Sequence, residues 1–214
     1  MTGEKPVLLR DEDGVFLSDG VMELRADFTH MLARIRPENL KRELMLRAAG
    51  IRNGRAELTV IDAAAGLGED ALLFAAAGCT VRMYEYDPVI AALLEDAMDK
   101  AAGVPGLAEA VSRMTLIRGD SISALPQLTV CPDVIYLDPM FPERKKSGLI
   151  KKKFQLLQQL ESPCCNEDDL LHSALAAGPK RVVIKRPLRE APLAGVRPAF
   201  SLCGKTIRFD CVMP

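Results

Sequence analysis

The feature that most constrains the fold is the run VIDAAAGLGEDALLFAAAG at positions 60–78, in which an apolar strand pattern passes through a glycine turn into a helical pattern. Gly66 and Gly68 would let the backbone turn tightly and approach a ligand closely. This succession of strand, turn and helix is typical of the first unit of a nucleotide-binding α/β fold. It favours a sheet of parallel strands over an all-helical or all-β architecture.

The rest of the chain continues this pattern, because apolar strand-like runs alternate with helical ones from Leu58 onward. We expect strands at 58–61, 81–85, 114–117, 134–137 and 181–185, and helices at 70–77, 88–101, 152–160 and 167–177. Such alternation indicates a mainly parallel sheet with helices on both faces. The tail AFSLCGKTIRFDCV reads as two further strands around Gly204. A C-terminal antiparallel hairpin after five parallel strands predicts the Rossmann-like α/β fold of class I methyltransferases.

The first fifty residues do not follow this alternation. Residues 7–18 alternate around a D-G turn and predict a small hairpin. A single helix is expected from Pro37 to Gly50, with proline in its first turn and glycine as its stop. We therefore divide the chain into an N-terminal hairpin and helical extension, residues 1–52, and a methyltransferase domain, residues 53–214.

Composition excludes several classes of protein. Hydrophobic residues make up 49% and charged residues 27% of the 214 residues, which is typical of a globular domain. No apolar run has the length of a membrane span, and the N-terminus has no signal-peptide pattern. We therefore expect a cytoplasmic protein without a membrane partner. The six cysteines lack CxxC spacing and there are two histidines, so we expect no metal site.

The glycine turn alone permits two cofactors, because Gly66, Gly68 and Ala71 also satisfy the dinucleotide pattern of NAD-binding folds. The neighbouring charges separate them. A pyrophosphate would meet Glu69 and Asp70 at the helix start and Asp62 at the strand end, at a cost of about 1 to 4 kcal/mol per carboxylate–phosphate pair at 4 Å. S-adenosyl-L-methionine has no phosphate and carries cationic sulfonium and ammonium groups. The three acidic residues therefore favour S-adenosyl-L-methionine as the cofactor.

Further cofactor contacts are expected at the ends of the next strands. Glu85 follows Gly66 by 19 residues, close to the spacing of a carboxylate that binds ribose hydroxyls. Asp120, in the run RGDS, is placed to accept a hydrogen bond from an adenine amino group. Tyr86 is placed to pack on the adenine or the ribose.

The run DPMFP at 138–142 follows the fourth expected strand, at the sheet edge where open α/β folds bind ligands. Its pattern is similar to the Asp-Pro-x-Phe type of tetrapeptide in enzymes that methylate exocyclic amino groups. The Asp138 carboxylate and the Pro139 carbonyl would accept the two N–H groups of an aromatic amine. Phe141 would offer a face on which the base stacks. These three residues are the predicted catalytic set.

Basic residues follow this motif closely and predict contacts with nucleic-acid phosphates. The predicted RNA-binding residues are Arg144, Lys145, Lys146, Lys151, Lys152 and Lys153, joined by Lys185 and Arg186 after the fifth strand. The net charge of the whole chain is -1, so any binding of RNA depends on local patches rather than on the overall field.

Four runs of sequence carry a family resemblance: DAAAGLGEDALLFAAAGCTVRMYEYDPVIAALL, YLDPMFPERKKSGLIKKK, RVVIKRP and TIRFD. Between about Val60 and Asp210 the chain resembles the ribosomal RNA small subunit methyltransferase J family. The resemblance implies methylation of the exocyclic amino group of one guanine in small-subunit (16S) rRNA, with the rRNA or the 30S subunit as partner. It also implies cofactor contacts at Glu69, Asp70, Glu85, Tyr86, Asp120, Ser121 and Asp138. Two departures are Asp62-Ala-Ala-Ala-Gly66 in place of D-A-T-A-G, and Glu85-Tyr86 in place of E-R.

Three alternatives remain open at the level of sequence. The acceptor amino group could belong to another RNA, to DNA or to a protein amide. The chain could be an NAD-dependent oxidoreductase, which the acidic helix start disfavours. It could also be a catalytically silent RNA-binding or assembly factor that retains the fold.

Overall fold

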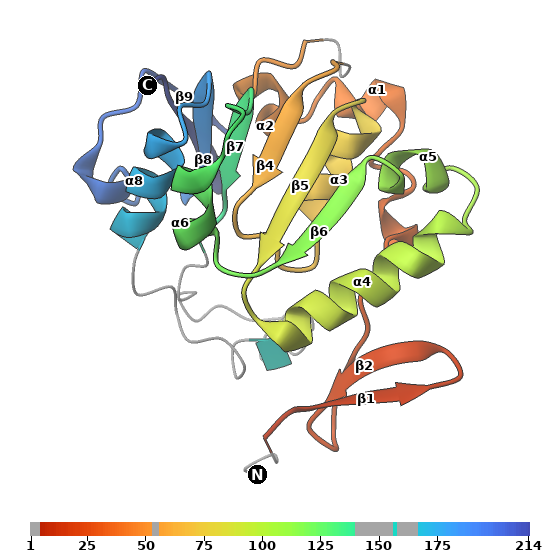
Figure 1. The fold of residues 1–214 in the computed structure, drawn as a ribbon. Helices are drawn as coiled ribbons and strands as arrows, with labels where there is room; N and C mark the ends of the chain where they lie inside the picture. The colour runs from red at the N-terminus through yellow and green to blue at the C-terminus, as the bar shows by residue number, and fades with distance from the viewer. Residues whose placement is uncertain (1–4, 53–55, 140–155, 158–166) are drawn as a thin grey trace.

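The computed structural model describes residues 5–52, 56–139, 156–157 and 167–214. At its centre is a seven-stranded sheet in the order β6-β5-β4-β7-β8-β10-β9 (Figure 1). The parallel strands are β4 (Thr59–Asp62), β5 (Thr80–Glu85), β6 (Met114–Arg118), β7 (Val134–Leu137) and β8 (Arg181–Pro187). The antiparallel C-terminal hairpin consists of β9 (Phe200–Cys203) and β10 (Ile207–Val212), with β10 between β8 and β9. The predicted class I methyltransferase fold is confirmed.

The strand order reverses at β4, because the chain proceeds to β5 and β6 on one side and then returns to β7 on the other. In open α/β sheets, ligands bind at the carboxyl ends of the strands beside such a reversal. In Figure 1 the carboxyl ends of the parallel strands lie at the lower edge of the sheet. The candidate site is therefore expected where β4, β5 and β7 end.

Helices cover both faces of the sheet, and the strands alternate between them. Val60, Val134 and Tyr136 belong to one buried cluster, together with residues of α3 and α4. Ile61, Ile135 and residues of α8 belong to the other. Helices on the first face are α3 (Glu69–Ala76), α4 (Pro88–Ala102) and α5 (Ala108–Val111). On the second face lie α6 (Ser121–Ala124), α8 (Glu167–Ala176) and the 3₁₀ turns η2 (Leu125–Gln127) and η3 (Leu193–Gly195).

The N-terminal extension begins with the expected hairpin, β1 (Val7–Asp11) and β2 (Gly14–Ser18), to which β3 (Glu23–Leu24) adds a short third strand. The 3₁₀ turn η1 (Thr29–Met31) follows. The prediction of one helix from Pro37 to Gly50 is wrong, because the structure has two, α1 (Pro37–Leu40) and α2 (Leu44–Ala48). Glu43 interrupts them with an extended backbone (ψ 115°) and binds Arg34 through both carboxylate oxygens, at 2.7 and 2.9 Å.

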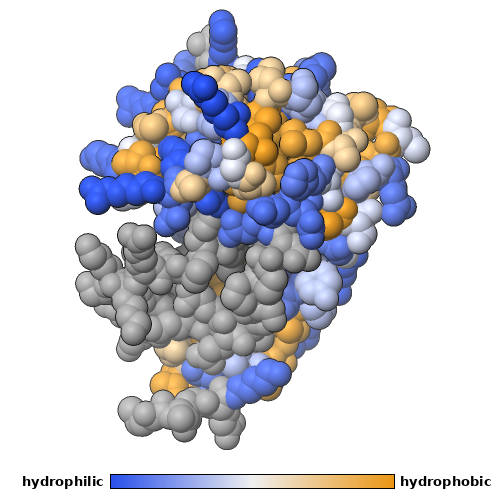
Figure 2. Space-filling view, turned by 90° about the vertical axis from the view of Figure 1, so that its left-hand side faces the viewer, coloured by the Kyte–Doolittle hydropathy of each residue, from blue (hydrophilic) through white to orange (hydrophobic). Residues whose placement is uncertain are grey.

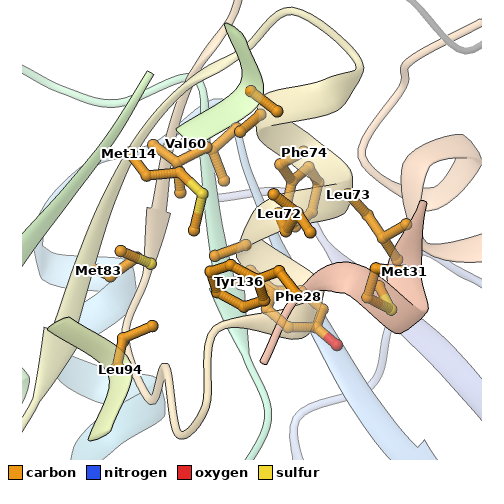
Figure 3. Close-up of a cluster of buried hydrophobic side chains, with 14 of the residues drawn as sticks. Phe28, Met31, Val60, Leu72, Leu73, Phe74, Met83, Leu94, Met114 and Tyr136 are labelled. Carbon is orange, nitrogen blue, oxygen red and sulfur yellow. The ribbon is translucent and has the colours of Figure 1, made fainter. Parts of the chain in front are cut away.

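The extension contributes to the main core. Phe28 and Met31 are 2% exposed and lie in the same cluster as Leu73 and Phe74 of α3 (Figure 3). Within the same buried cluster, α2 packs against β8, β9 and β10. The domain boundary at residue 52 stays a prediction, and it adjoins residues 53–55, which lie outside the described part of the chain.

The side of the molecule that carries β9 and α8 has a mixed surface, on which hydrophobic and hydrophilic residues alternate in patches (Figure 2). Phe200 and Leu188 are among the exposed large hydrophobic residues. Within the described ranges, every helix is too short or too polar to cross a membrane.

Candidate cofactor and catalytic site

The glycine turn after β4 adopts the conformation that its glycines were expected to permit. Gly66 and Gly68 have φ angles of 54° and 76°, in the left-handed region that favours glycine. A Cβ atom added to Gly68 would lie 2.6 Å from Leu94 Cδ1, whereas one added to Gly66 would meet no atom within 4 Å. Gly68 therefore allows close packing of the turn on α4, and Gly66 faces open space.

Glu85, at the end of β5, holds the turn in place. Its Oε2 accepts a hydrogen bond from Gly66 N at 2.9 Å, and its Oε1 accepts one from Asp87 N at 2.8 Å. Burial raises the pKa of Glu85 above its ordinary value, and the two backbone donors oppose that effect. The next residue, Tyr86, is 79% exposed. Glu85, predicted to bind a ribose, lies beside the open space at Gly66.

Asp120 and Ser121 lie after β6, at the start of α6. The Asp120 carboxylate caps this helix by accepting hydrogen bonds from Ile122 N and Ser123 N, at 3.0 and 3.2 Å. Ser121 is buried, and its hydroxyl donates to Ala63 O at 2.7 Å. Ser121 thus joins the end of β6 to the segment after β4, and Asp120 fixes the start of α6.

The most highly charged part of the site lies where β4, β7 and β8 end. Lys185 Nζ donates to Asp70 Oδ2 at 2.8 Å and to Asp138 Oδ2 at 2.7 Å. Tyr136 OH donates to Asp70 Oδ2 at 2.6 Å, and the Tyr136 ring packs edge-on against Phe74. We call Asp62, Asp70, Asp138, Lys185 and Tyr136 the carboxylate cluster.

The alternation of the strands explains why these side chains share one face. Asp62 continues the face of Val60 in β4, and Tyr136 pairs with it in register on β7. Asp138 and Lys185 lie two residues beyond Tyr136 and Val183, both of which are buried on that same face. This face is the one that α3 covers, and α3 brings Asp70 in its first turn. Asp138 therefore meets Lys185 because of the register between β7 and β8.

The carboxylate cluster contains more acidic groups than basic ones. Asp62 is 1% exposed, and burial together with the nearby Asp70 carboxylate raises its pKa to about 8. Burial also raises the pKa of Asp138, an effect that Lys185 opposes. Burial disfavours the charge on Lys185, but the Asp70 and Asp138 carboxylates outweigh it and raise the pKa of Lys185. Three carboxyl groups thus lie near one ammonium, and the raised pKa of Asp62 favours its protonated form near neutral pH.

This set of groups fits a cationic cofactor. A second positive charge would neutralise the carboxylate that Lys185 leaves uncompensated and would favour ionisation of Asp62. A pyrophosphate at the same place would add negative charge to a group of acids that already retains a proton. Glu69, also in the first turn of α3, lies 3.2 Å from His30 Nε2 and adds to the acidic character of the helix start.

Tyr136 was not among the predicted site residues, and Lys185, predicted to lie on an RNA-facing rim, binds Asp70 and Asp138 instead. The lysine at the end of the apolar run Val182–Ile184 in β8 was the available signal. Arg186 is 6% exposed, and its guanidinium binds Glu167 Oε2 at 3.0 Å and Ala191 O at 2.9 Å. Its place in an RNA-facing rim stays a prediction that the structure does not support.

Several predicted residues lie outside the described part of the chain: Phe141, Arg144, Lys145, Lys146, Lys151, Lys152 and Lys153, and with them most of the helix expected at 152–160. Pro139 is described and buried, directly after Asp138. Among the described residues, no group of three or more His, Cys, Asp or Glu side chains is placed to hold a metal ion.

Comparisons with known proteins identify related methyltransferases. A family model described as "Putative SAM-dependent methyltransferase" matches residues 7–214. The curated protein "Ribosomal RNA small subunit methyltransferase J" of Thioalkalivibrio sulfidiphilus is 40% identical, over 97% of this chain and 84% of its own length. The protein of the same name from Pectobacterium atrosepticum is 45% identical, over 80% of this chain and 69% of its own length.

Solved structures show the same fold. The crystal structure of a SAM-dependent methyltransferase from Neisseria gonorrhoeae superposes with a TM-score of 0.80 and 32% identity, over 100% of this chain and 85% of that one. An rRNA methyltransferase from Streptomyces viridochromogenes has a TM-score of 0.54 at 18% identity, over 83% of this chain and 85% of that one, and shares the fold alone.

Together, the sheet order, the glycine turn and these matches define a class I methyltransferase that uses S-adenosyl-L-methionine. The resemblance stated from the sequence is confirmed. The chain belongs to the ribosomal RNA small subunit methyltransferase J family.

Proposed function

We propose that this chain transfers the methyl group of S-adenosyl-L-methionine to the exocyclic N2 amino group of a guanine in small-subunit rRNA. The observation that carries the proposal is the position of Asp138 and Pro139, directly after β7, with Asp138 fixed by Lys185 at the sheet edge that bears the glycine turn. The curated relatives are named as small-subunit rRNA methyltransferases, which supports rRNA as the substrate.

The acceptor amine explains the residue types in the motif. The lone pair of an exocyclic amine is delocalised into the aromatic ring, so the amine is a poor nucleophile. Hydrogen bonds from its two N–H groups to the Asp138 carboxylate and the Pro139 carbonyl return electron density to the nitrogen. Proline suits this position because it has no N–H of its own and limits motion of the backbone.

The proposed reaction forms one bond and breaks one, and Asp138 accepts the proton that is released. When bound, the cofactor supplies a methyl carbon made electrophilic by the adjacent sulfonium. The guanine N2 lone pair forms the new N–C bond, the electrons of the C–S bond return to sulfur, and the proton on N2 passes to the Asp138 carboxylate. Lys185 keeps Asp138 ionised before the transfer, and Asp138 orients the amine for in-line attack.

We assign the cofactor to the carboxyl ends of β4, β5 and β6. The open space at Gly66 would admit it, Glu85 would accept from its ribose, and the carboxylate cluster would receive its cationic end. The proposed cofactor-binding residues are Asp62, Gly66, Gly68, Glu69, Asp70, Glu85, Tyr86, Asp120, Ser121 and Asp138.

On the RNA side, Phe141 would stack on the flipped guanine, and the basic residues at 144–153 would bind phosphates near it. Lys185 serves the carboxylate cluster in this assignment, and Arg186 is left out because its guanidinium is buried on Glu167 and Ala191. The partner would be the small-subunit rRNA, free or in the 30S particle, in the cytoplasm.

Label transfer tests this function. The protein is incubated with cofactor labelled on its methyl group and with small ribosomal subunits from a strain that lacks this methyltransferase. We expect label in the rRNA and, after digestion, in guanosine. Label in ribosomal protein, or none in either fraction, would overturn the proposed substrate.

A further inference from the structure

The N-terminal extension carries a cluster of exposed cations that the proposed site does not use. We call it the α1–α2 basic surface. It consists of Arg36, Lys41, Arg42, Arg47 and Arg52, all of which are exposed. None of the five makes an ion pair or a side-chain hydrogen bond with any residue in the described ranges.

Several other cations on the protein are paired with carboxylates. Lys100 binds Asp96 at the surface, and Lys180 binds Asp133. Arg34, the neighbour of the basic surface in sequence, is held by Glu43. Residues 30–52 contain six Arg or Lys and two Glu, a net charge of +4, in a chain whose total is -1. This segment therefore carries an excess of positive charge, as does the run at 144–153.

The surface rests on a rigid base. Pro37 opens α1, and Leu40 is 3% exposed. In α2, Met45 and Leu46 are 1% and 0% exposed. Because these buried residues fix both short helices to the core, the cations beside them are displayed at set positions. Like charges without partners disfavour folding through mutual repulsion, so the excess of cations in this segment favours binding of an anionic ligand over a structural role.

The surface lies at the opposite end of β8 from the carboxylate cluster. Arg181 Nη1 donates to Ala48 O at 2.8 Å, which ties the end of α2 to the first residue of β8. Lys185 of the carboxylate cluster lies four residues further along that strand, or about 13 Å at the rise of a parallel strand. In Figure 1, α1 and α2 lie toward the upper edge of the sheet, opposite the edge that bears the site.

We propose that the α1–α2 basic surface binds the phosphate backbone of the rRNA substrate, at a distance from the methylated base. This inference rests on the proposed function and adds a second RNA contact, separate from the basic run at 144–153. Four of the five cations are arginines, whose planar guanidinium binds phosphate through two parallel hydrogen bonds. A folded RNA is large enough to reach this surface while one flipped base lies at Asp138.

Salt dependence of binding tests the proposal. The affinity for small subunits from a strain that lacks this methyltransferase is measured against salt concentration, at constant Mg²⁺, for wild type and for Arg42→Gln with Arg47→Gln. The control variant, Arg82→Gln with Arg197→Gln, removes the same charge from exposed positions elsewhere. Cofactor binding by calorimetry establishes that each variant is folded.

We expect the slope of log K against log salt to become shallower by about 1.4 to 1.8 in the α1–α2 variant, or about 0.7 to 0.9 for each contact, and to stay unchanged in the control. Equal slopes for all three proteins, while the wild type still methylates the subunit, would overturn the proposed RNA-binding role of this surface. The proposed function would still stand. A wild type that neither binds nor methylates the subunit would overturn both.

Discussion

Lys185 Nζ lies 2.7 Å from Asp138 Oδ2, so the first residue of the DPMFP motif is held by a cation from the neighbouring strand. The same ammonium binds Asp70 at 2.8 Å, and through it the start of α3. One side chain thereby connects the proposed amine-binding residue to the helix that follows the cofactor turn. Lys185 is a positioning residue in this account.

Replacing Lys185 by methionine removes the ammonium and keeps an unbranched apolar side chain that ends where the lysine ε carbon stood. Since a hydrogen bond to a charged group contributes about 1.5–3 kcal/mol, we expect kcat to fall about 10- to 150-fold. The loss of Lys185 also raises the pKa of Asp138 further, so the remaining activity should shift to higher pH. Methylation rates measured across pH check both effects.

Lys180→Met is the matched control, because Lys180 pairs with Asp133 at the opposite edge of the sheet. It should retain the wild-type rate and pH profile. Lys185→Arg should recover part of the rate, since it restores the charge with a different shape. A Lys185→Met variant with the wild-type pH profile would show that Lys185 has no part in setting the pKa of Asp138.

Asp62→Asn should stabilise the protein increasingly as pH rises. The pKa of Asp62 is raised from 3.8 to about 8 in the folded chain, so between these values the folded state binds a proton that the unfolded state has lost. The free energy of unfolding of the wild type therefore falls as pH rises across that window. The asparagine does not titrate, so the Tm difference between variant and wild type should grow by several degrees up to about pH 8. A difference that is constant from pH 5 to 8 would place Asp62 in its ordinary titration range.

The same carboxyl group predicts that cofactor binding releases a proton. A cation bound beside Asp62 lowers its pKa, so below about pH 8 the affinity for S-adenosyl-L-methionine should rise with pH. Calorimetry in buffers of different ionisation enthalpy measures the released proton directly. The Asp62→Asn variant should release fewer protons when the cofactor binds. Identical proton release by both proteins would show that cofactor binding does not change the protonation of Asp62.

The two glycines of the turn should respond differently to alanine. Both require a left-handed backbone, which costs an alanine about 1–2 kcal/mol. At Gly68 the new Cβ would also meet Leu94 at 2.6 Å, whereas at Gly66 it would face open space. We expect Gly68→Ala to lower Tm more, and Gly66→Ala to weaken cofactor binding out of proportion to its small loss of stability. Equal effects of both changes on Tm and affinity would contradict this division.

Neutralising Lys151, Lys152 and Lys153 should weaken RNA binding. If all three bind phosphates, the slope of log K against log salt should become shallower by about 0.7 to 0.9 for each contact removed. Filter binding at several salt concentrations measures it. An unchanged slope would indicate that these lysines form an ordinary solvated surface.

Much of the fold could be predicted because strand periodicity is local. The strand predicted at 134–137 matches β7, and the helix predicted at 88–101 differs from α4 by one residue. The single helix expected from Pro37 was wrong, because the pairing of Glu43 with Arg34 and the burial of Met45 and Leu46 decide where α2 begins. Such contacts are tertiary and leave no periodic signal.

The site could be predicted in part. The residues at the strand ends, such as Asp62 and Glu85, follow from the strand–turn–helix pattern. The partners of Lys185 could not be assigned, because they depend on the register of β8 against β7 and on the placement of α3. Asp120 shows a further limit, since one carboxylate can cap a helix and still face a ligand.

The most direct test of the central claim is a single-turnover methylation of small subunits by the wild type and by Asp138→Asn, followed by nucleoside analysis of the rRNA. We predict that the wild type converts one guanosine to N2-methylguanosine. The Asp138→Asn variant should bind the subunit with similar affinity and form the product at least about 100-fold more slowly. Methylation of a different nucleoside, or an unchanged rate in the variant, would contradict the account.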